Sequence, residues 1–139
     1  MVGLAEKGHI NVRLTGRGRG GHASTPPVET AVTRVARAVR RVVANPFPRR
    51  LSRTVHAFLT ALTGENGGLL RLLFRLRPLT NPLILAFLDR GGQASAMIRT
   101  TQAVTVISGG SAENVLPASA TAIVNIRLLH GDTIEGALA

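Results

Sequence analysis

The chain has 139 residues, of which 45% are hydrophobic and 17% charged, which is enough for one domain with a hydrophobic core. It contains no cysteine, so disulfides and thiolate metal sites are excluded, and cysteine usage does not indicate the cellular compartment. A net charge of +10 suggests nucleic acid as a partner, but the chain has no Tyr or Trp to stack on bases, and no apolar run is long enough for a membrane span.

The first predicted element is a half-buried strand over residues 9–15, where apolar and polar side chains alternate. A glycine-rich segment, residues 16–21, is expected to end this strand in an open turn. Glycine there accepts positive φ angles and leaves room for another group to approach. His22 would be presented on this turn, although a lone histidine in such a connector is also typical of one that merely faces water.

An amphipathic helix is predicted next, from about Pro27 to Ala44, with valines along one face, Val28 included, and arginines along the other. Pro27 suits the first turn of a helix. The sequence Asn-Pro-Phe-Pro at 45–48 ends the helix, because the residue before a proline disfavours helical geometry.

Residues 47–95 have a different composition and are predicted to form a helical insertion with its own small core. Ser52 is expected to cap a first helix. A second helix is expected at 69–76, and Asn81-Pro82 is expected to supply the cap and first residue of a third.

Two further strands are predicted over residues 97–107 and 118–129, because both stretches are rich in β-branched side chains. Asp132 or Thr133 is expected to cap a final helix that begins at Ile134. This order predicts an α+β fold, the ferredoxin-like split βαβ sandwich, as a single domain over 1–139. Its last strand is missing and would lie beyond Ala139, so a domain truncated at its C-terminal end is expected.

No metal site is readable, because the four histidines, at 9, 22, 56 and 130, lack the spacing of metal ligands. Three polar residues stand out instead: His22 after the first strand, Asn114 before the last, and Arg127 within it. A lone arginine in a strand is usually a solvent-facing residue. An arginine near an asparagine and a histidine could instead hold a carboxylate in a bidentate pair.

Three motifs in this order resemble the dimerisation (lid) domain of the zinc-dependent aminoacylase and carboxypeptidase family, which includes succinyl-diaminopimelate desuccinylase and β-alanine synthase. They are GGHASTP at 20–26, ENVLP at 113–117, and AIVNIR at 122–127 followed by Gly131-Asp132-Thr133. The long insertion and the sequence Ile98-Arg99-Thr100-Thr101 look most like the carboxypeptidase S and N-acyl-amino-acid hydrolase branch.

The resemblance implies a homodimer formed through the lid domain, and a separate catalytic domain with two zinc ions that is not in this chain. It implies that His22 reaches the partner's active site to stabilise an oxyanion, and that Asn114 and Arg127 hold an N-acyl amino acid or peptide substrate. On this interpretation the fragment alone is inactive, needs no cofactor of its own, binds no nucleic acid and has no membrane span. The alternative is a stand-alone basic α+β module for RNA or acidic partners.

Overall fold

The computed structural model describes residues 7–62, 68, 76–90 and 92–139 of the chain. These residues fall into two compact units. The sheet unit comprises His9–Pro46 and Gln102–Arg127, and the helical unit comprises the described parts of Met1–Gly8, Phe47–Thr101 and Leu128–Ala139. Both helices and an antiparallel sheet are present, so the predicted α+β class is confirmed.

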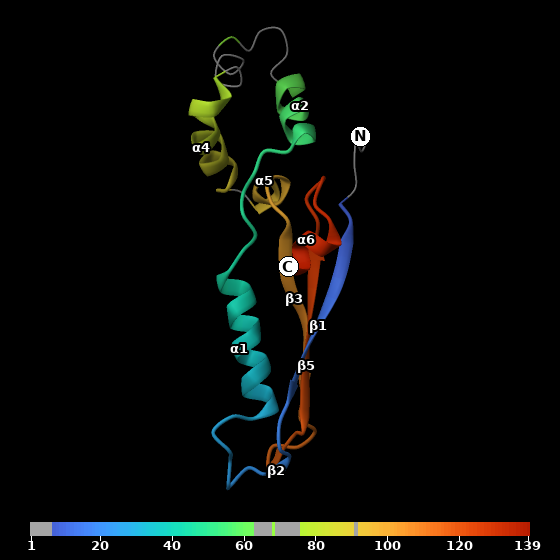
Figure 1. Cartoon of the computed structure of the whole chain (residues 1–139). Coiled ribbons are helices and arrows are strands. Elements are labelled where there is room, and N and C mark those ends of the chain that lie inside the picture. The colour runs from blue at the N-terminus through green and yellow to red at the C-terminus, as the bar shows by residue number, and fades with distance from the viewer. Residues whose placement is uncertain (1–6, 63–67, 69–75, 91) are drawn as a thin grey trace. The chain divides into compact units, whose positions relative to one another are not determined.

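The sheet is built from β1 (His9–Arg17), β5 (Ser119–Arg127) and β3 (Thr101–Gly109), with β5 in the centre (Figure 1). β1 and β5 are antiparallel, in a register that runs from His9 opposite Arg127 to Arg17 opposite Ser119. The last of these three strands in chain order, β5, lies between the two earlier ones, β1 and β3, which is compatible with the ferredoxin-like sandwich. The expected strands at 9–15 and 118–129 are therefore confirmed.

The core of the sheet unit lies between β5 and the helix α1 (Ala31–Ala44), which covers one face of the sheet (Figure 1). Alternate residues of β5 point to this face and are buried, while the residues between them are partly exposed, as the sequence pattern predicted. The buried cluster and the apolar side chains packed on it are Ala31, Val35, Ala120 and Ala122, with Leu14, Val39 and Val104.

Two glycines of the predicted turn act through close packing. A Cβ on Gly16 would lie 2.5 Å from the Ala31 carbonyl oxygen, and one on Gly18 would lie 2.7 Å from the Ala31 nitrogen. Neither has a positive φ angle, so the expected open turn at this point is wrong. β1 instead continues to Arg17. Because Gly16 and Gly18 have no side chain, the start of α1 can approach this part of the chain closely.

The helix α1 begins four residues later than predicted. Thr30 is its N-cap, and a reciprocal capping box forms because the Thr33 N–H donates to Thr30 Oγ1 at 3.1 Å while the Thr30 N–H donates to Thr33 Oγ1 at 2.9 Å. This capping box, and not Pro27, sets the start of the helix. Val28 lies outside the helix and is fully exposed, so its predicted place on the packed face is wrong.

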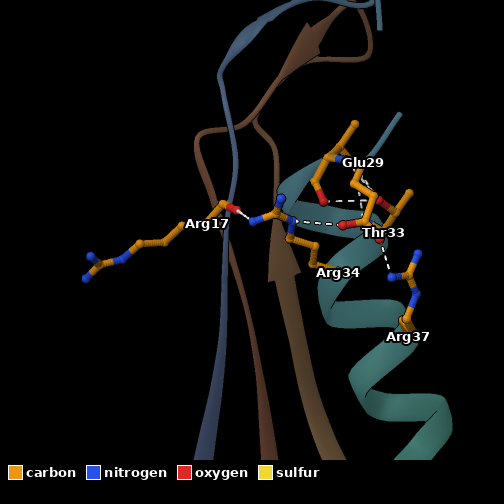
Figure 2. Close-up of polar contacts among 6 residues, drawn as sticks. Arg17, Glu29, Thr33, Arg34 and Arg37 are labelled. Atoms are coloured by element: carbon orange, nitrogen blue, oxygen red, sulfur yellow. Dashed lines mark hydrogen bonds and ion pairs between the residues drawn. The ribbon is translucent and has the colours of Figure 1, made fainter. Parts of the chain in front are cut away.

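Polar contacts also fix the first turns of α1 (Figure 2). Glu29 accepts from Arg34, with 3.3 Å between the ion-pair atoms, and also pairs with Arg37. Arg34 Nη1 donates to the carbonyl oxygen of Arg17 on β1 at 3.0 Å. The side chains involved are largely solvent-exposed, so these contacts orient the helix start more than they stabilise the fold.

The helical unit contains α2 (Arg53–Leu62), α4 (Arg77–Leu88), α5 (Gly92–Met97) and α6 (Ile134–Leu138). Ser52 Oγ accepts from the Val55 N–H at 3.2 Å, and Thr133 Oγ1 accepts from the Gly136 N–H at 3.1 Å, so both predicted caps are confirmed. None of the described helices is long and apolar enough to cross a bilayer.

Two predictions for this unit are wrong. α4 begins before Asn81 and has a proline in its first turn, so Pro82 lies inside the helix. Met97 ends the short helix α5, which the sequence pattern missed, and β3 starts only at Thr101. The helix expected at 69–76 falls mostly outside the described residues.

A buried threonine links two segments of the helical unit that are distant in sequence, the one before β3 and the one after β5. Thr100 is 2% exposed, and its Oγ1 accepts from the Leu129 N–H at 2.7 Å and donates to Asp132. Asp132 also pairs with Arg50. The buried apolar residues of this unit are Val55, Ile98, Leu128 and Leu129.

Candidate functional site

A small two-stranded antiparallel sheet brings His22 and Asn114 together. β2 (Gly21–His22) pairs with β4 (Val115–Leu116), and His22 lies directly opposite Val115. The Ala23 N–H donates to the Asn114 carbonyl oxygen at 2.9 Å, so the two predicted site residues flank the same pair of strands. Both are exposed, and they extend beyond one end of the three-stranded sheet (Figure 1).

The contacts of the His22 ring define its proton-bearing nitrogen. The Ser24 N–H donates to His22 Nδ1 at 3.2 Å, and Ser24 Oγ lies 2.8 Å from the same atom. A backbone N–H can only donate, so Nδ1 is the acceptor and the neutral ring carries its proton on Nε2. His22 therefore offers an exposed Nε2–H as a hydrogen-bond donor.

Arg127 lies far from this two-stranded sheet in the same chain. It is the last residue of β5, whereas the two-stranded sheet adjoins the first, Ser119. β5 is nine residues long, and a rise of about 3.3 Å per residue separates its ends by about 26 Å. The three predicted site residues thus occupy two places: His22 with Asn114 at one end of β5, and Arg127 at the other.

Sequence reasoning missed the polar neighbours of these residues. Ser24 lies inside the quoted motif, but its contact with His22 depends on the turn geometry that follows β2. Asn11 and Asn125 lie on different strands, and only the register of β1 and β5 places them opposite each other.

No group of three His, Asp or Glu side chains in the described part of the chain lies close enough to hold a metal ion. The described residues therefore do not fit a zinc site, and no step through zinc is assigned to them. Two cavities of about 180 and 490 Å³ in the helical unit are lined by residues around Arg50, and none of the three predicted site residues lines either of them.

The sequence profile that describes the peptidase dimerisation domain matches residues 4–139. This chain belongs to the peptidase dimerisation domain family. The match covers nearly the whole chain and both halves of the site described above. The predicted resemblance to the family is thus confirmed.

Relatives of this dimerisation domain include the human N-fatty-acyl-amino acid synthase/hydrolase PM20D1, 35% identical over 99% of this chain and 28% of its own length. Probable carboxypeptidase S-like 2 of Dictyostelium discoideum is 35% identical over 95% of this chain and 25% of its own. Carboxypeptidase S of Saccharomyces cerevisiae is 27% identical over 94% of this chain and 24% of its own length. These relatives confirm the predicted branch.

The dimerisation domain spans about a quarter of the length of these relatives. Their names describe hydrolases, and this chain corresponds to one part of such a protein. No solved structure matches the chain with statistical significance.

Proposed function

We propose that this chain is the dimerisation and substrate-clamp domain of a zinc-dependent amidohydrolase or exopeptidase that cleaves an amide next to a free carboxylate. The family match and the names of the relatives support an N-acyl amino acid or a peptide as the substrate. The zinc ions and the groups that activate water would belong to other parts of the parent enzyme. The clamp consists of His22, Asn114 and Arg127.

The surface through which two copies pair is the edge of β3 together with the adjoining side of α1. Val106 and Ile107 on β3 are 52% and 65% exposed, and Val32, which contacts the β3 end at Gly109, is 42% exposed. Exposed residues on the opposite edge strand β1 are polar or charged, which protects a free strand edge from pairing. Burial of apolar surface therefore favours self-association through β3.

Two-fold symmetry across β3 brings the separated parts of the clamp together. A two-fold axis there makes the β5 strands of the two subunits antiparallel, so the Arg127 end of one lies beside the His22 end of the other. Three strand spacings of about 4.8 Å put these ends about 14 Å apart, against about 26 Å within one chain. Each clamp then takes Arg127 from one subunit and His22 and Asn114 from its partner.

The chemistry of each side chain suits this role. Arg127 pairs with the free carboxylate of the substrate, because a guanidinium binds a planar carboxylate in two parallel hydrogen bonds. His22 donates its Nε2–H to the carbonyl oxygen as that oxygen gains negative charge. Asn114 holds the substrate backbone through its side-chain amide. The observation that carries the proposal is the position of His22 and Asn114 at the opposite end of β5 from Arg127.

The test uses the full-length parent enzyme. His22→Ala should lower kcat about a hundredfold or more, and Arg127→Ala should mainly raise KM because it removes ground-state binding. The two variants are then mixed under conditions where subunits exchange. With free exchange, half of the dimers are mixed and each has one intact clamp. At a substrate concentration well below the KM of the Arg127→Ala variant, about a quarter of the wild-type activity should therefore return.

A mixture of His22→Ala with Asn114→Ala is the matched control. In each clamp these two residues come from the same subunit, so every mixed dimer has one defect in each clamp and no activity should return. Recovery in the control, or none with Arg127→Ala once exchange is shown, would contradict the shared clamp. Because the chain has no cysteine, Ala36→Cys on α1 should also give a covalent dimer with a short bismaleimide, whereas Arg13→Cys on β1 should not.

A further inference from the structure

Arg127 is the end of a chain of side-chain hydrogen bonds across two strands. Its Nε donates to Asn125 Oδ1 at 3.0 Å, and Asn125 Nδ2 donates to Asn11 Oδ1 at 2.7 Å. Asn11 and Asn125 are partners in the register of β1 and β5. All three side chains belong to the face of the sheet opposite α1, where β1 and β5 expose their polar residues.

The direction of this chain of hydrogen bonds follows from chemistry. Arginine has donors and no acceptor, so Asn125 must turn its oxygen toward Arg127. Its amide nitrogen then points to β1, and Asn11 must in turn present its oxygen. Each amide thus has one possible orientation, which restricts the rotamers of the guanidinium that Asn125 holds.

The contact also decides which edge of the guanidinium is left for a ligand. Nε is used by Asn125, and among the residues that the structure describes no other hydrogen bond or ion pair of the Arg127 guanidinium occurs. This contact leaves the two terminal nitrogens, Nη1 and Nη2, for a ligand. A carboxylate can bind a guanidinium either through Nε and one Nη or through both Nη groups, and here only the second mode is open.

We propose that Asn125, held by Asn11, is a positioning residue that presents the Nη1–Nη2 edge of Arg127 to the substrate carboxylate. This inference rests on the proposed function, in which Arg127 binds that carboxylate. Asn125 itself does not touch the substrate. Its effect is to reduce the side-chain freedom that Arg127 would otherwise lose on binding.

The experiment compares single and double variants of the full-length parent enzyme with two substrates, one carrying the free carboxylate and one its primary amide. Asn125→Ala should raise KM for the carboxylate substrate roughly fivefold, the usual effect of one lost hydrogen bond, and leave kcat and the KM of the amide unchanged. Asn11→Ala should produce a smaller change in the same direction. Thr121→Ala, on the same face of β5, is the control and should change neither constant.

A double-mutant cycle separates positioning from a general structural effect. In the Arg127→Ala background, Asn125→Ala should have no further effect on KM. In this chain, the Arg127 Nε–H should exchange with solvent more slowly than in the Asn125→Ala variant, measured by ¹⁵N NMR. A KM effect that persists without Arg127, or an unchanged Nε–H exchange rate, would overturn the positioning role. If Arg127→Ala leaves KM for the carboxylate unchanged, the proposed function fails instead.

Discussion

Substitution of Gly16 by alanine should destabilise the sheet unit, although the backbone there accepts any residue. A Cβ at this position would meet the Ala31 carbonyl oxygen at 2.5 Å and Val35 Cγ2 at 2.8 Å, so α1 must move away from β1. Overpacking of this kind costs about 1–3 kcal/mol. The loss of glycine's freedom in the unfolded chain offsets about 0.4–1 kcal/mol of that cost.

The net expectation for Gly16→Ala is a loss of about 1–2 kcal/mol in the free energy of unfolding, measured by urea denaturation of this chain. Gly21→Ala is the matched control, because a Cβ there meets no heavy atom within 4 Å and its φ angle is not positive. That variant should be neutral or slightly more stable. If Gly16→Ala is as stable as Gly21→Ala, the close contact between β1 and α1 is not as described.

Two other changes test the helix start and the acid sensitivity of the helical unit. Thr30→Ala should cost about 1 kcal/mol in urea denaturation by removing the cap of α1, whereas Thr25→Ala, outside the helix, should cost little. The hydrogen bond from Ser95 lowers the pKa of Asp89, and the charges of Arg99 and Arg49 lower it further. The ionised Asp89 therefore stabilises the folded state at a pH above its unfolded pKa of about 3.9. This stabilisation is lost as the pH falls through the lower pKa of the folded state. Asn in place of Asp89 should therefore lower the urea midpoint at neutral pH, and this difference should shrink below about pH 4; a difference that stays constant with pH would contradict the assignment.

The sheet could be predicted well because every second residue of β5, from Ala120 to Ile126, is apolar and buried. Ile123 is the one apolar residue of the other face, so burial on one face still fixes the pattern. The start of α1 could not be predicted as well, because two signals compete there. Pro27 favours a helix start, but Thr30 and Thr33 satisfy two backbone donors with their side chains, which proline cannot do.

The identity of the candidate site residues could be predicted from motifs, while their arrangement could not. β2 and β4 have two residues each, too few for any periodic signal, so the strand pairing that brings His22 close to Asn114 is visible only in the structure. The distance from Arg127 to this strand pair depends on the length of β5 and on its register with β1. The spacing of the motifs predicts neither the length of β5 nor its register with β1.

The central strand β5 also limits how this domain can change its length. Deletion of one residue from β5 would turn every following side chain to the opposite face, placing Asn125 and Arg127 in the core. Deletion of two residues keeps the faces but shortens the strand by about 7 Å. Related domains with insertions or deletions should therefore carry them in the loops and helices, and strand length should differ only in pairs of residues.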